Sequence, residues 1–377
     1  MRAPFVAAAA LLLAACASTE NLEPPAELQQ FDATLEVKRV WSTGLDGDDD
    51  ARAALVPLLA GERVYAAGNN GAVVALAVEN GSTLWRTDTR TRLSGGPGLG
   101  DGLVVVGGTD GVVIALDAET GTERWRHRVS SEVLAPPAVV NRIVLVRTGD
   151  GFVYGLDAAD GGQLWMHEQS VPSLVLRGVA GFAVAEDVAV TGYDNGRVNA
   201  LRVRDGDVVW ETPIATAAGR TEISRMIDVN ATPRVIGRDV YAVSYQGQLV
   251  AMALESGRVL WSNELSSSAG LDADGRAVFV SAADGDVHAF DRLTGVRLWQ
   301  QAALHARSLT APTVIGDAVA VGDFDGFVHF LSRASGELVA RVNLRSSAIH
   351  AAPAALGPWL VVQAADGTLT AYRVGAE

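Results

Sequence analysis

A unit of about forty residues recurs along almost the whole chain. In each copy an Asp-Gly or Asn-Gly pair, or a variant of it, precedes an apolar segment, and a second turn then leads to a tryptophan. Six copies are complete: NNGAVVALAVENGSTLW (69–85), TDGVVIALDAETGTERW (109–125), GDGFVYGLDAADGGQLW (149–165), DNGRVNALRVRDGDVVW (194–210), YQGQLVAMALESGRVLW (245–261) and ADGDVHAFDRLTGVRLW (283–299). Since such pairs favour tight hairpins and alternation favours pleated strands, the repeat predicts antiparallel strands.

Each unit predicts four strands. Upstream of a hairpin lie a Pro-marked strand start and an apolar strand, as in Ala135-Pro136-Pro137 and the stretch from Ile143 to Val146. Four-stranded units at this period are typical of a β-propeller. Eight units are counted from the hairpin glycines, in whose turns both central residues are expected to have positive φ: Gly71, Gly111, Gly151, Gly196, Gly247, Gly285, Gly326 and Gly367.

The last two units are incomplete. The seventh copy (324–340) lacks the tryptophan, with Val339 expected at its position, and the eighth starts at Ala365 without an outer strand. Residues 36–41 form an orphan strand that ends in Trp41. We therefore expect an all-β, eight-bladed propeller of four-stranded antiparallel blades over residues 36–377. The N-terminal strand should close the ring, and the recurring tryptophans should pack between blades.

Composition agrees with one folded domain. Hydrophobic residues make up 49% of the chain and charged residues 20%, a balance that excludes intrinsic disorder. The 40 glycines match a structure rich in turns. Acidic residues outnumber basic ones, 44 to 30, and no basic stripe is present, so nucleic acid is not an expected partner.

The N-terminus has the pattern of an export signal. Residues 1–15 combine Arg2, an apolar run and small residues, and the run is too short to span a membrane. Leu13-Ala14-Ala15-Cys16 resembles a bacterial lipobox, in which Cys16 carries the lipid and becomes the mature N-terminus. An ordinary signal peptide that contains a cysteine is the alternative. Because Cys16 is the only cysteine, an intramolecular disulfide is impossible.

Residues 16–35 are interpreted as a lipidated N-terminus followed by a flexible tether. The segment is polar and contains Pro24-Pro25. Ala17 rather than Asp follows the cysteine, and by resemblance to Gram-negative lipoproteins this implies the outer membrane, with the body facing the periplasm. Several acyl chains, such as palmitate, anchor stably where one does not.

No catalytic pattern is found. The six histidines show no paired metal-ligand spacing, and no nucleophile elbow, phosphate loop or zinc motif occurs. The repeats resemble pyrroloquinoline-quinone (PQQ) dehydrogenase propellers, but those enzymes also carry a calcium site and usually a vicinal cysteine pair. One cysteine cannot form that pair. We therefore expect no enzyme activity, no cofactor and no metal.

Insertions between blades indicate where a partner could bind. Successive hairpin glycines lie 40, 40, 45, 51, 38, 41 and 41 residues apart, so the excess falls in the connections after Trp165 and Trp210. Both connections should open on the face of the Asp-Gly hairpins and lie side by side. The first contains Ser173-Leu174-Val175-Leu176-Arg177-Gly178. Leu174 and Leu176 could be exposed anchor residues, or they could start the next inner strand and face the core; the pattern leaves both open.

The chain resembles the BamB family over essentially its whole length. The resemblance rests on the lipobox, the tether, the eight PQQ-like blades, and the motifs Ser-Leu-x-Leu-Arg-Gly and Thr-Glu-Ile-x-Arg (221–225). The resemblance implies a non-enzymatic scaffold of the β-barrel assembly machinery that binds the periplasmic POTRA domains of BamA and assists insertion of outer-membrane proteins. It places partner-binding residues at Leu174, Leu176, Arg177 and Asp228. The family usually has an acid where this chain has Asn230, which puts a two-carboxylate contact in doubt.

Two other classes compete with this interpretation. One is a PQQ-dependent or sugar-acting periplasmic enzyme, and the other is a lipoprotein scaffold of a different envelope complex. Strand addition of nascent outer-membrane proteins to blade edges is a further possibility, although the sequence does not indicate which edges are open.

Overall fold

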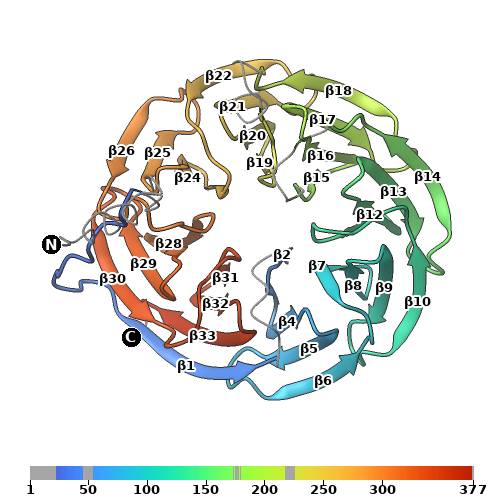
Figure 1. The fold of residues 1–377 in the computed structure, drawn as a ribbon, viewed down its shortest axis with the longest axis horizontal. Helices are drawn as coiled ribbons and strands as arrows, with labels where there is room; N and C mark the ends of the chain where they lie inside the picture. The colour runs from blue at the N-terminus through green and yellow to red at the C-terminus, as the bar shows by residue number, and fades with distance from the viewer. Residues whose placement is uncertain are drawn as a thin grey trace, which may run out of the picture.

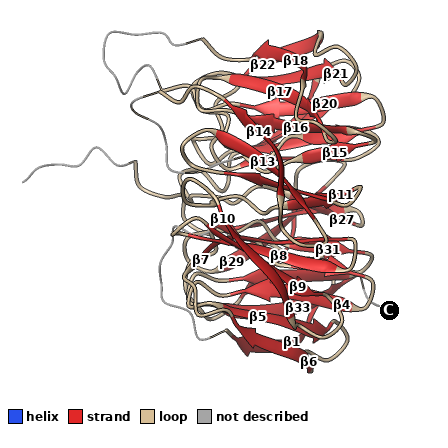
Figure 2. Ribbon diagram, turned by 90° about the vertical axis from the view of Figure 1, so that its right-hand side faces the viewer, coloured by secondary structure: helices blue, strands red, loops and turns tan. Residues whose placement is uncertain are grey.

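Eight β-sheets surround a central axis in the computed structural model, which describes residues 23–45, 54–172, 174, 178, 180–216 and 226–375 (Figure 1). Across these residues every regular element is a strand, and no helix is long and apolar enough to cross a membrane. Seen from the side, the sheets stack into a disc-like body (Figure 2). The predicted eight-bladed propeller is confirmed. The signal peptide and Cys16 lie outside the described residues.

Each blade runs from an inner strand at the axis to an outer strand at the rim. Blade one contains β3 (Leu58–Ala60), β4 (Arg63–Ala67), β5 (Ala72–Ala77) and β6 (Thr83–Asp88). Blade two contains β7 (Leu93–Gly100), β8 (Leu103–Gly108), β9 (Val112–Asp117) and β10 (Glu123–Arg128). Blade three contains β11 (Ala138–Val140), β12 (Ile143–Arg147), β13 (Phe152–Asp157) and β14 (Gln163–Glu168). Blade four contains β15 (Ala183–Ala185), β16 (Val188–Gly192), β17 (Arg197–Arg202) and β18 (Val208–Pro213).

The second half of the ring repeats this order. Blade five contains β19 (Arg234–Ile236), β20 (Asp239–Val243), β21 (Gln248–Ala253) and β22 (Val259–Glu264). Blade six contains β23 (Gly270–Ala273), β24 (Ala277–Ser281), β25 (Val287–Asp291) and β26 (Arg297–Gln301). Blade seven contains β27 (Thr313–Ile315), β28 (Ala318–Gly322), β29 (Phe327–Ser332) and β30 (Leu338–Asn343). Blade eight contains β31 (Ala354–Leu356), β32 (Trp359–Gln363) and β33 (Thr368–Val374).

The N-terminal strand completes blade eight, as predicted. Strand β1 (Val37–Gly44) pairs antiparallel with β33, from Val37 opposite Val374 to Gly44 opposite Thr368. It extends past the predicted end at Trp41, which lies in its middle. One addition departs from the four-stranded pattern: β2 (Ala54–Leu55) pairs parallel with β7 and gives blade two a fifth strand.

The hairpins between the two middle strands differ from the predicted turn. In blade three the Gly151 N–H donates to the Thr148 carbonyl (3.2 Å), and the Thr148 N–H donates to the Phe152 carbonyl (3.0 Å). Of the residues in this turn, only Gly151 has a positive φ, at 94°. The expectation of two central residues with positive φ is therefore wrong here. A turn followed by one left-handed glycine closes the hairpin, as in longer hairpin loops.

The tryptophans pack between blades, as predicted. Each indole N–H donates to a main-chain carbonyl of the next blade at 2.6–3.1 Å, for Trp41, Trp85, Trp125, Trp165, Trp210, Trp261 and Trp299. A glycine turn of that next blade lies on the ring. At Gly121 an added Cβ would be 2.5 Å from the Trp85 ring, so this position requires glycine.

Blade seven is the exception. Ala340, rather than Val339, occupies the tryptophan position, because it pairs with Phe330 as Trp299 pairs with Ala289. Residues 23–36, here named the N-terminal strap, lie against this blade. The Thr34 and Leu35 N–H groups both donate to the Val339 carbonyl, at 2.9 and 3.1 Å. The expectation of a flexible tether therefore does not hold for residues 23–35.

Candidate docking surface

Two long connections rise on one face of the disc. They join β14 to β15 (residues 169–182) and β18 to β19 (residues 214–233), and they leave the outer strands on the side of the Gly151 and Gly196 hairpins. We call this side the loop face, and the side of glycine turns such as Gly121 the turn face. Leu176 and Arg177 lie outside the described residues, as do 217–225 of the second connection.

Leu174 lies on the surface. Its side chain is 44% exposed, and the next inner strand begins only at Ala183. The alternative in which Leu174 starts that strand and faces the core is therefore wrong. Its side chain is therefore accessible to a partner.

The two connections are joined to each other, so they form one surface. With its amide nitrogen facing the two acceptors, Asn230 donates to the Gly178 carbonyl (3.1 Å) and to Asp194 Oδ1 (2.8 Å). Further along, the Gly181 N–H donates to Thr232 Oγ1 (2.9 Å). Asn230 thus helps to hold the two connections together.

A buried arginine supports this junction from below. Arg147, at the end of β12, is 1% exposed, and its guanidinium donates to the carbonyls of Gly192 and Ala180. It lies 3.7 Å from the Asp194 carboxylate and 4.5 Å from the centre of the Tyr193 ring. Arg147 therefore connects blade three to the first connection and to the hairpin of blade four.

Burial perturbs the titration of these groups. It raises the pKa of the Asp194 carboxyl, although Arg147 opposes the shift, and it lowers the pKa of Arg147. It also raises the pKa of Tyr193 to about 12. Because a buried charge that loses its partner costs about 3–5 kcal/mol, Arg147 and Asp194 depend on each other. The resulting base of the surface is rigid.

Asp228 lies inside the protein rather than on its surface. Its side chain is 1% exposed, and its carbonyl accepts the Tyr245 N–H at 2.9 Å. A direct contact with a partner would require the second connection to move. Its burial suits Asp228 to orient neighbouring groups inside the second connection.

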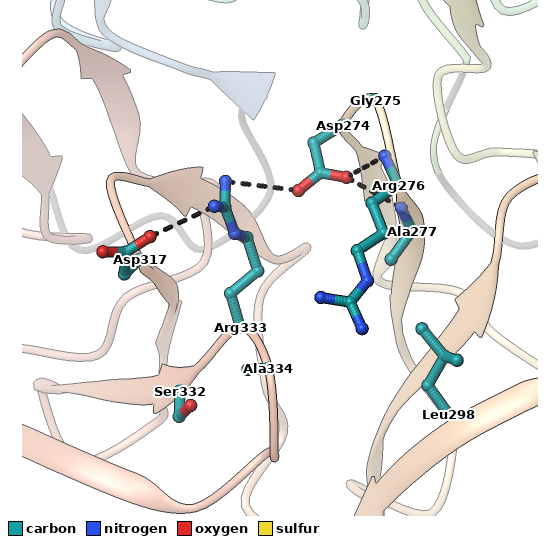
Figure 3. A pocket seen from close by; sticks show the side chains of 9 residues that line it. All are labelled: Asp274, Gly275, Arg276, Ala277, Leu298, Asp317, Ser332, Arg333 and Ala334. Atoms are coloured by element: carbon teal, nitrogen blue, oxygen red, sulfur yellow. Dashed lines mark hydrogen bonds and ion pairs between the residues drawn. The ribbon is translucent and has the colours of Figure 1, made fainter.

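Two depressions among the described residues have volumes typical of small-molecule sites. One, of about 330 Å³, is lined mainly by small apolar residues near the axis and borders the second connection at Asn230. The other, of about 460 Å³, lies on the turn face between blades six and seven (Figure 3). There Arg333 pairs with Asp274 (3.4 Å) and Asp317 (3.1 Å). Arg276 also lines this depression, so its two arginines balance its two aspartates in charge. The depression is remote from the long connections.

Within the described part of the chain, one group has the composition of a metal site. Asp284, Asp286 and His305 bring one ligand atom each to within 4.8 Å of the others. His305 Nδ1 is already hydrogen-bonded to Asp286 (3.1 Å), and its Nε2 pairs with Glu23 of the strap (3.3 Å). These contacts satisfy the imidazole without an ion.

Sequence reasoning missed the buried base formed by Arg147, Tyr193 and Asp194. A signal was available, because Arg147 ends the otherwise apolar strand Ile143-Val144-Leu145-Val146. The sequence pattern alone does not show whether an arginine at the end of an apolar strand is buried, as Arg147 is, or exposed to solvent.

Comparison with known proteins identifies the family. The family model described as "Outer membrane protein assembly factor BamB" matches residues 69–301 and 283–375. The outer membrane protein assembly factor BamB of Pseudomonas aeruginosa is 47% identical over 369 residues, covering 97% of each chain. The crystal structure of BamB from Moraxella catarrhalis is similar with a TM-score of 0.82 and 34% identity, covering 90% of this chain and all of that one.

Solved enzymes share only the fold. A quinohemoprotein alcohol dehydrogenase from Pseudomonas putida has a TM-score of 0.71 at 15% identity, covering 90% of this chain and 76% of the enzyme. Family membership instead follows from the relatives that match at high identity over nearly their whole length. This chain belongs to the family of the outer membrane protein assembly factor BamB.

Proposed function

We propose that this chain is a non-enzymatic lipoprotein scaffold of the outer-membrane β-barrel assembly complex, and that its loop face binds the periplasmic POTRA domains of BamA. The observation that carries the proposal is the joined pair of long connections, with exposed Leu174 above a rigid buried base. Because buried hydrogen bonds and an ion pair hold the described base in place, the partner does not have to order it, which lowers the entropy lost on binding.

The roles of the residues follow from their chemistry. Leu174 and Leu176 provide apolar anchors, each contributing about 1.5–3 kcal/mol if fully buried in a groove of the partner. Arg177 pairs with acidic or carbonyl groups at the edge of that contact. Asp228 acts from inside the second connection, where its burial suits it to orient its neighbours.

The experiment is co-purification with BamA from detergent-solubilised membranes. The triple variant Leu174→Ala, Leu176→Ala and Arg177→Ala should lose BamA while keeping the thermal unfolding of the wild type. A matched control changes two exposed leucines and an arginine of blade six, Leu293→Ala, Leu298→Ala and Arg297→Ala. Unchanged co-purification of the first variant, or equal loss in the control, would contradict the proposed surface.

The membrane attachment is tested separately. Lipidation at Cys16, with palmitate among the acyl chains, would hold the protein at the outer membrane facing the periplasm. The variant Cys16→Ser should lose fatty-acid labelling and appear in the soluble periplasmic fraction. A Cys16→Ser protein that still fractionates with the outer membrane and carries label would exclude this anchor.

The absence of cofactor chemistry is part of the proposal. It is supported by the lone cysteine, which cannot form a vicinal pair, and by the family name that the relatives carry. Incubation with PQQ and calcium should leave the difference spectrum unchanged. A bound quinone would favour the enzyme alternative.

A further inference from the structure

The N-terminal strap follows blade seven from the loop face toward the turn face. At the loop face the Ala26 N–H donates to the His305 carbonyl (2.9 Å), in the connection that follows β26. Midway, Arg341 of β30 donates to the Gln29 carbonyl (3.0 Å). Near the start of β30, Thr34 and Leu35 donate to Val339. The strap therefore runs opposite to β30, and its first residues lie at the loop face.

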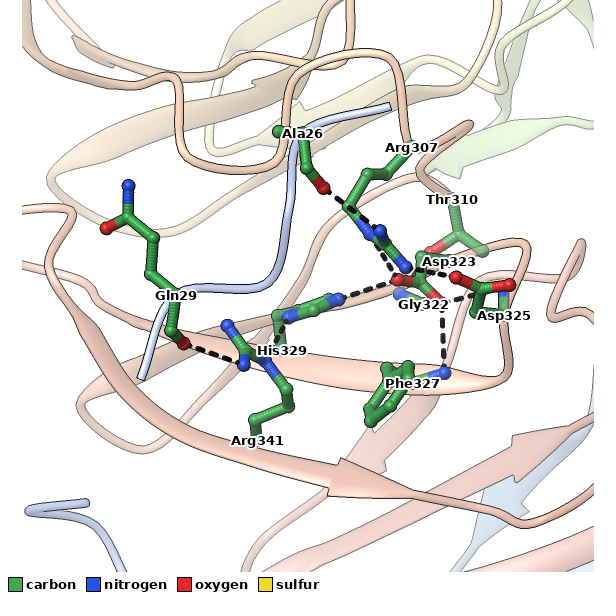
Figure 4. A network of polar contacts seen from close by, with 10 residues as sticks. All are labelled: Ala26, Gln29, Arg307, Thr310, Gly322, Asp323, Asp325, Phe327, His329 and Arg341. Atoms are coloured by element: carbon green, nitrogen blue, oxygen red, sulfur yellow. Dashed lines mark hydrogen bonds and ion pairs between the residues drawn. The ribbon is translucent and has the colours of Figure 1, made fainter. Parts of the chain in front are cut away.

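The arginine that contacts the strap at the loop face is held in place by blade seven itself. Arg307 donates to the Ala26 carbonyl at 3.1 Å (Figure 4). Its other nitrogens pair with Asp323 (2.8 Å) and Asp325 (2.6 Å), and the side chain is almost fully buried. Because blade seven holds the guanidinium in place, binding of the strap costs little side-chain entropy.

The second arginine belongs to the same network. Arg341 Nε donates to His329 Nδ1 (3.1 Å), and His329 Nε2 lies 2.9 Å from Asp323 Oδ2 (Figure 4). The Arg341 guanidinium also lies 5.1 Å from the centre of the Phe31 ring, within the range of a cation–π contact. Asp323 thus links both strap-binding arginines through one buried carboxylate.

Apolar packing fixes the other end of the strap. Leu35 and Val37 pack on the core between blades seven and eight, beside Val339 and Val342. Strand β1 follows immediately and closes the ring. The strap is consequently held at both ends as well as in its middle.

We propose that the strap fixes the point at which the N-terminus leaves the propeller, and so holds the loop face toward the membrane. The inference rests on the proposed lipid anchor at Cys16. Six residues lie between Cys16 and Glu23, and the seven steps from one to the other span at most about 25 Å. A free tether over residues 17–35 would reach about 65 Å when extended and would impose no orientation.

The first measurement is hydrogen exchange of the mature, lipidated chain in detergent. Peptides that contain the amides of Thr34 and Leu35 should exchange at least tenfold more slowly than an unstructured segment. In the variant Ala26→Pro, Thr34→Pro and Phe31→Ala, which removes two donors and the ring, the protection of Leu35 should be lost. The control Ala26→Ser and Thr34→Ala keeps both N–H groups and should remain protected. Unprotected strap amides in the wild type would overturn the proposal.

The second measurement is energy transfer from the protein to acceptor dyes in vesicles. Blade two offers exposed label positions on both faces, Asp110 in a loop-face hairpin and Glu119 in a turn-face turn. The six residues of β9 separate them by about 20 Å. A lipidated Cys16 does not react, so one introduced cysteine labels each site. Transfer should be greater from Asp110→Cys than from Glu119→Cys, and the difference should disappear in the strap variant.

The two underlying proposals can fail separately. Equal transfer from both faces of the wild type, or a difference that survives in the strap variant, would overturn the orientation. If the wild-type chain does not sediment with vesicles, the proposed anchor is wrong and the proposed orientation falls with it. Protected strap amides would still show that the strap is docked on blade seven.

Discussion

Seven of the eight contacts between neighbouring blades are built alike, and the eighth is not. In the seven, a tryptophan of an outer strand donates its N–H to the next blade and lies under that blade's glycine turn, as Trp85 does at Ala118 and Gly121. Between blades seven and eight, Ala340 stands at the tryptophan position, and the strap residue Leu35 packs nearby.

The difference follows from where the chain begins and ends. Blade eight takes its outer strand from the N-terminus, so it has no turn between its third and fourth strands. In place of that turn, the Gly375 N–H donates to the Glu36 carbonyl (2.9 Å). A tryptophan at position 340 would have no turn to cover. The strap provides the contacts there instead.

The largest expected effect is at a tryptophan joint. Trp125→Ala removes a buried ring and a hydrogen bond, and it should lower the free energy of unfolding by about 3–5 kcal/mol in urea titration. The exposed Leu84→Ala in the same class of outer strand is the control and should cost little. A similar loss in both variants would show that the joints are not where stability is concentrated.

The reverse substitution tests the exceptional joint. Ala340→Trp introduces a ring that has no turn to cover and must displace strap contacts, so we expect a loss of about 1–3 kcal/mol, measured by the same titration. A gain in stability would mean that the position accepts a regular joint and that the difference between the joints is incidental.

Removal of the strap should cost less. A chain with residues 23–35 deleted keeps β1 and therefore a closed ring. It loses main-chain hydrogen bonds, each worth about 0.5–1.5 kcal/mol, but recovers the entropy of the strap, so a net loss of about 1–2 kcal/mol is expected in urea titration. If the deleted chain does not fold, the strap is instead an essential part of the core of blade eight.

The smallest expected effect is the dependence of the strap joint on pH. Burial lowers the pKa of His329 despite its hydrogen bond to Asp323, so the unfolded chain binds this proton more readily. Stability should fall as the pH drops below the unfolded value of about 6.5. His329→Gln should reduce the change in melting temperature between pH 7.5 and 5.5, whereas the exposed control His350→Gln should not. If the pH dependence of the melting temperature is unaltered in His329→Gln, titration of His329 does not cause the loss of stability.

Asp323 acts in the same direction at lower pH. Burial opposes ionisation of its carboxyl, but hydrogen bonds from His329 and the Phe327 N–H prevail, and the net effect lowers its pKa. A carboxyl with a depressed folded pKa stabilises the protein above its unfolded value and loses this contribution as the pH falls through the folded value. Acidification therefore weakens the strap joint in two successive windows.

Local repetition made most of the ring predictable. The period, the hairpin glycines and the tryptophans all recur within single units, so the blades, their number and the closing strand could be inferred. The exact position of a residue within a unit was harder to predict. Ala340, not Val339, stands at the tryptophan position, and only Gly151 has a positive φ in its hairpin turn.

Contacts between distant segments were beyond the sequence pattern. The strap has the polar, Pro-containing composition of a linker, yet its partners Arg307 and Arg341 lie 281 and 312 residues away from the residues that they bind. The proposed docking surface was inferred from the lengths of its connections, and the exposure of Leu174 is compatible with that proposal. Its buried base depends on the proximity of Arg147 and Asp194 in three dimensions. The only sign of it in the sequence is an arginine at the end of an apolar strand.

The pairing of β1 with β33 has a mechanical consequence. A force applied at the N-terminus would load the strap first and reach the closing strand only after the contacts at Ala26, Gln29 and Leu35 had yielded. Since Val37 is the strap-side end of the β1–β33 pair, an unprotected seam would open one residue pair at a time from that point. With the proposed anchor at Cys16, the contacts of the strap with blade seven would bear tension from the membrane before the β1–β33 pair that keeps the ring closed.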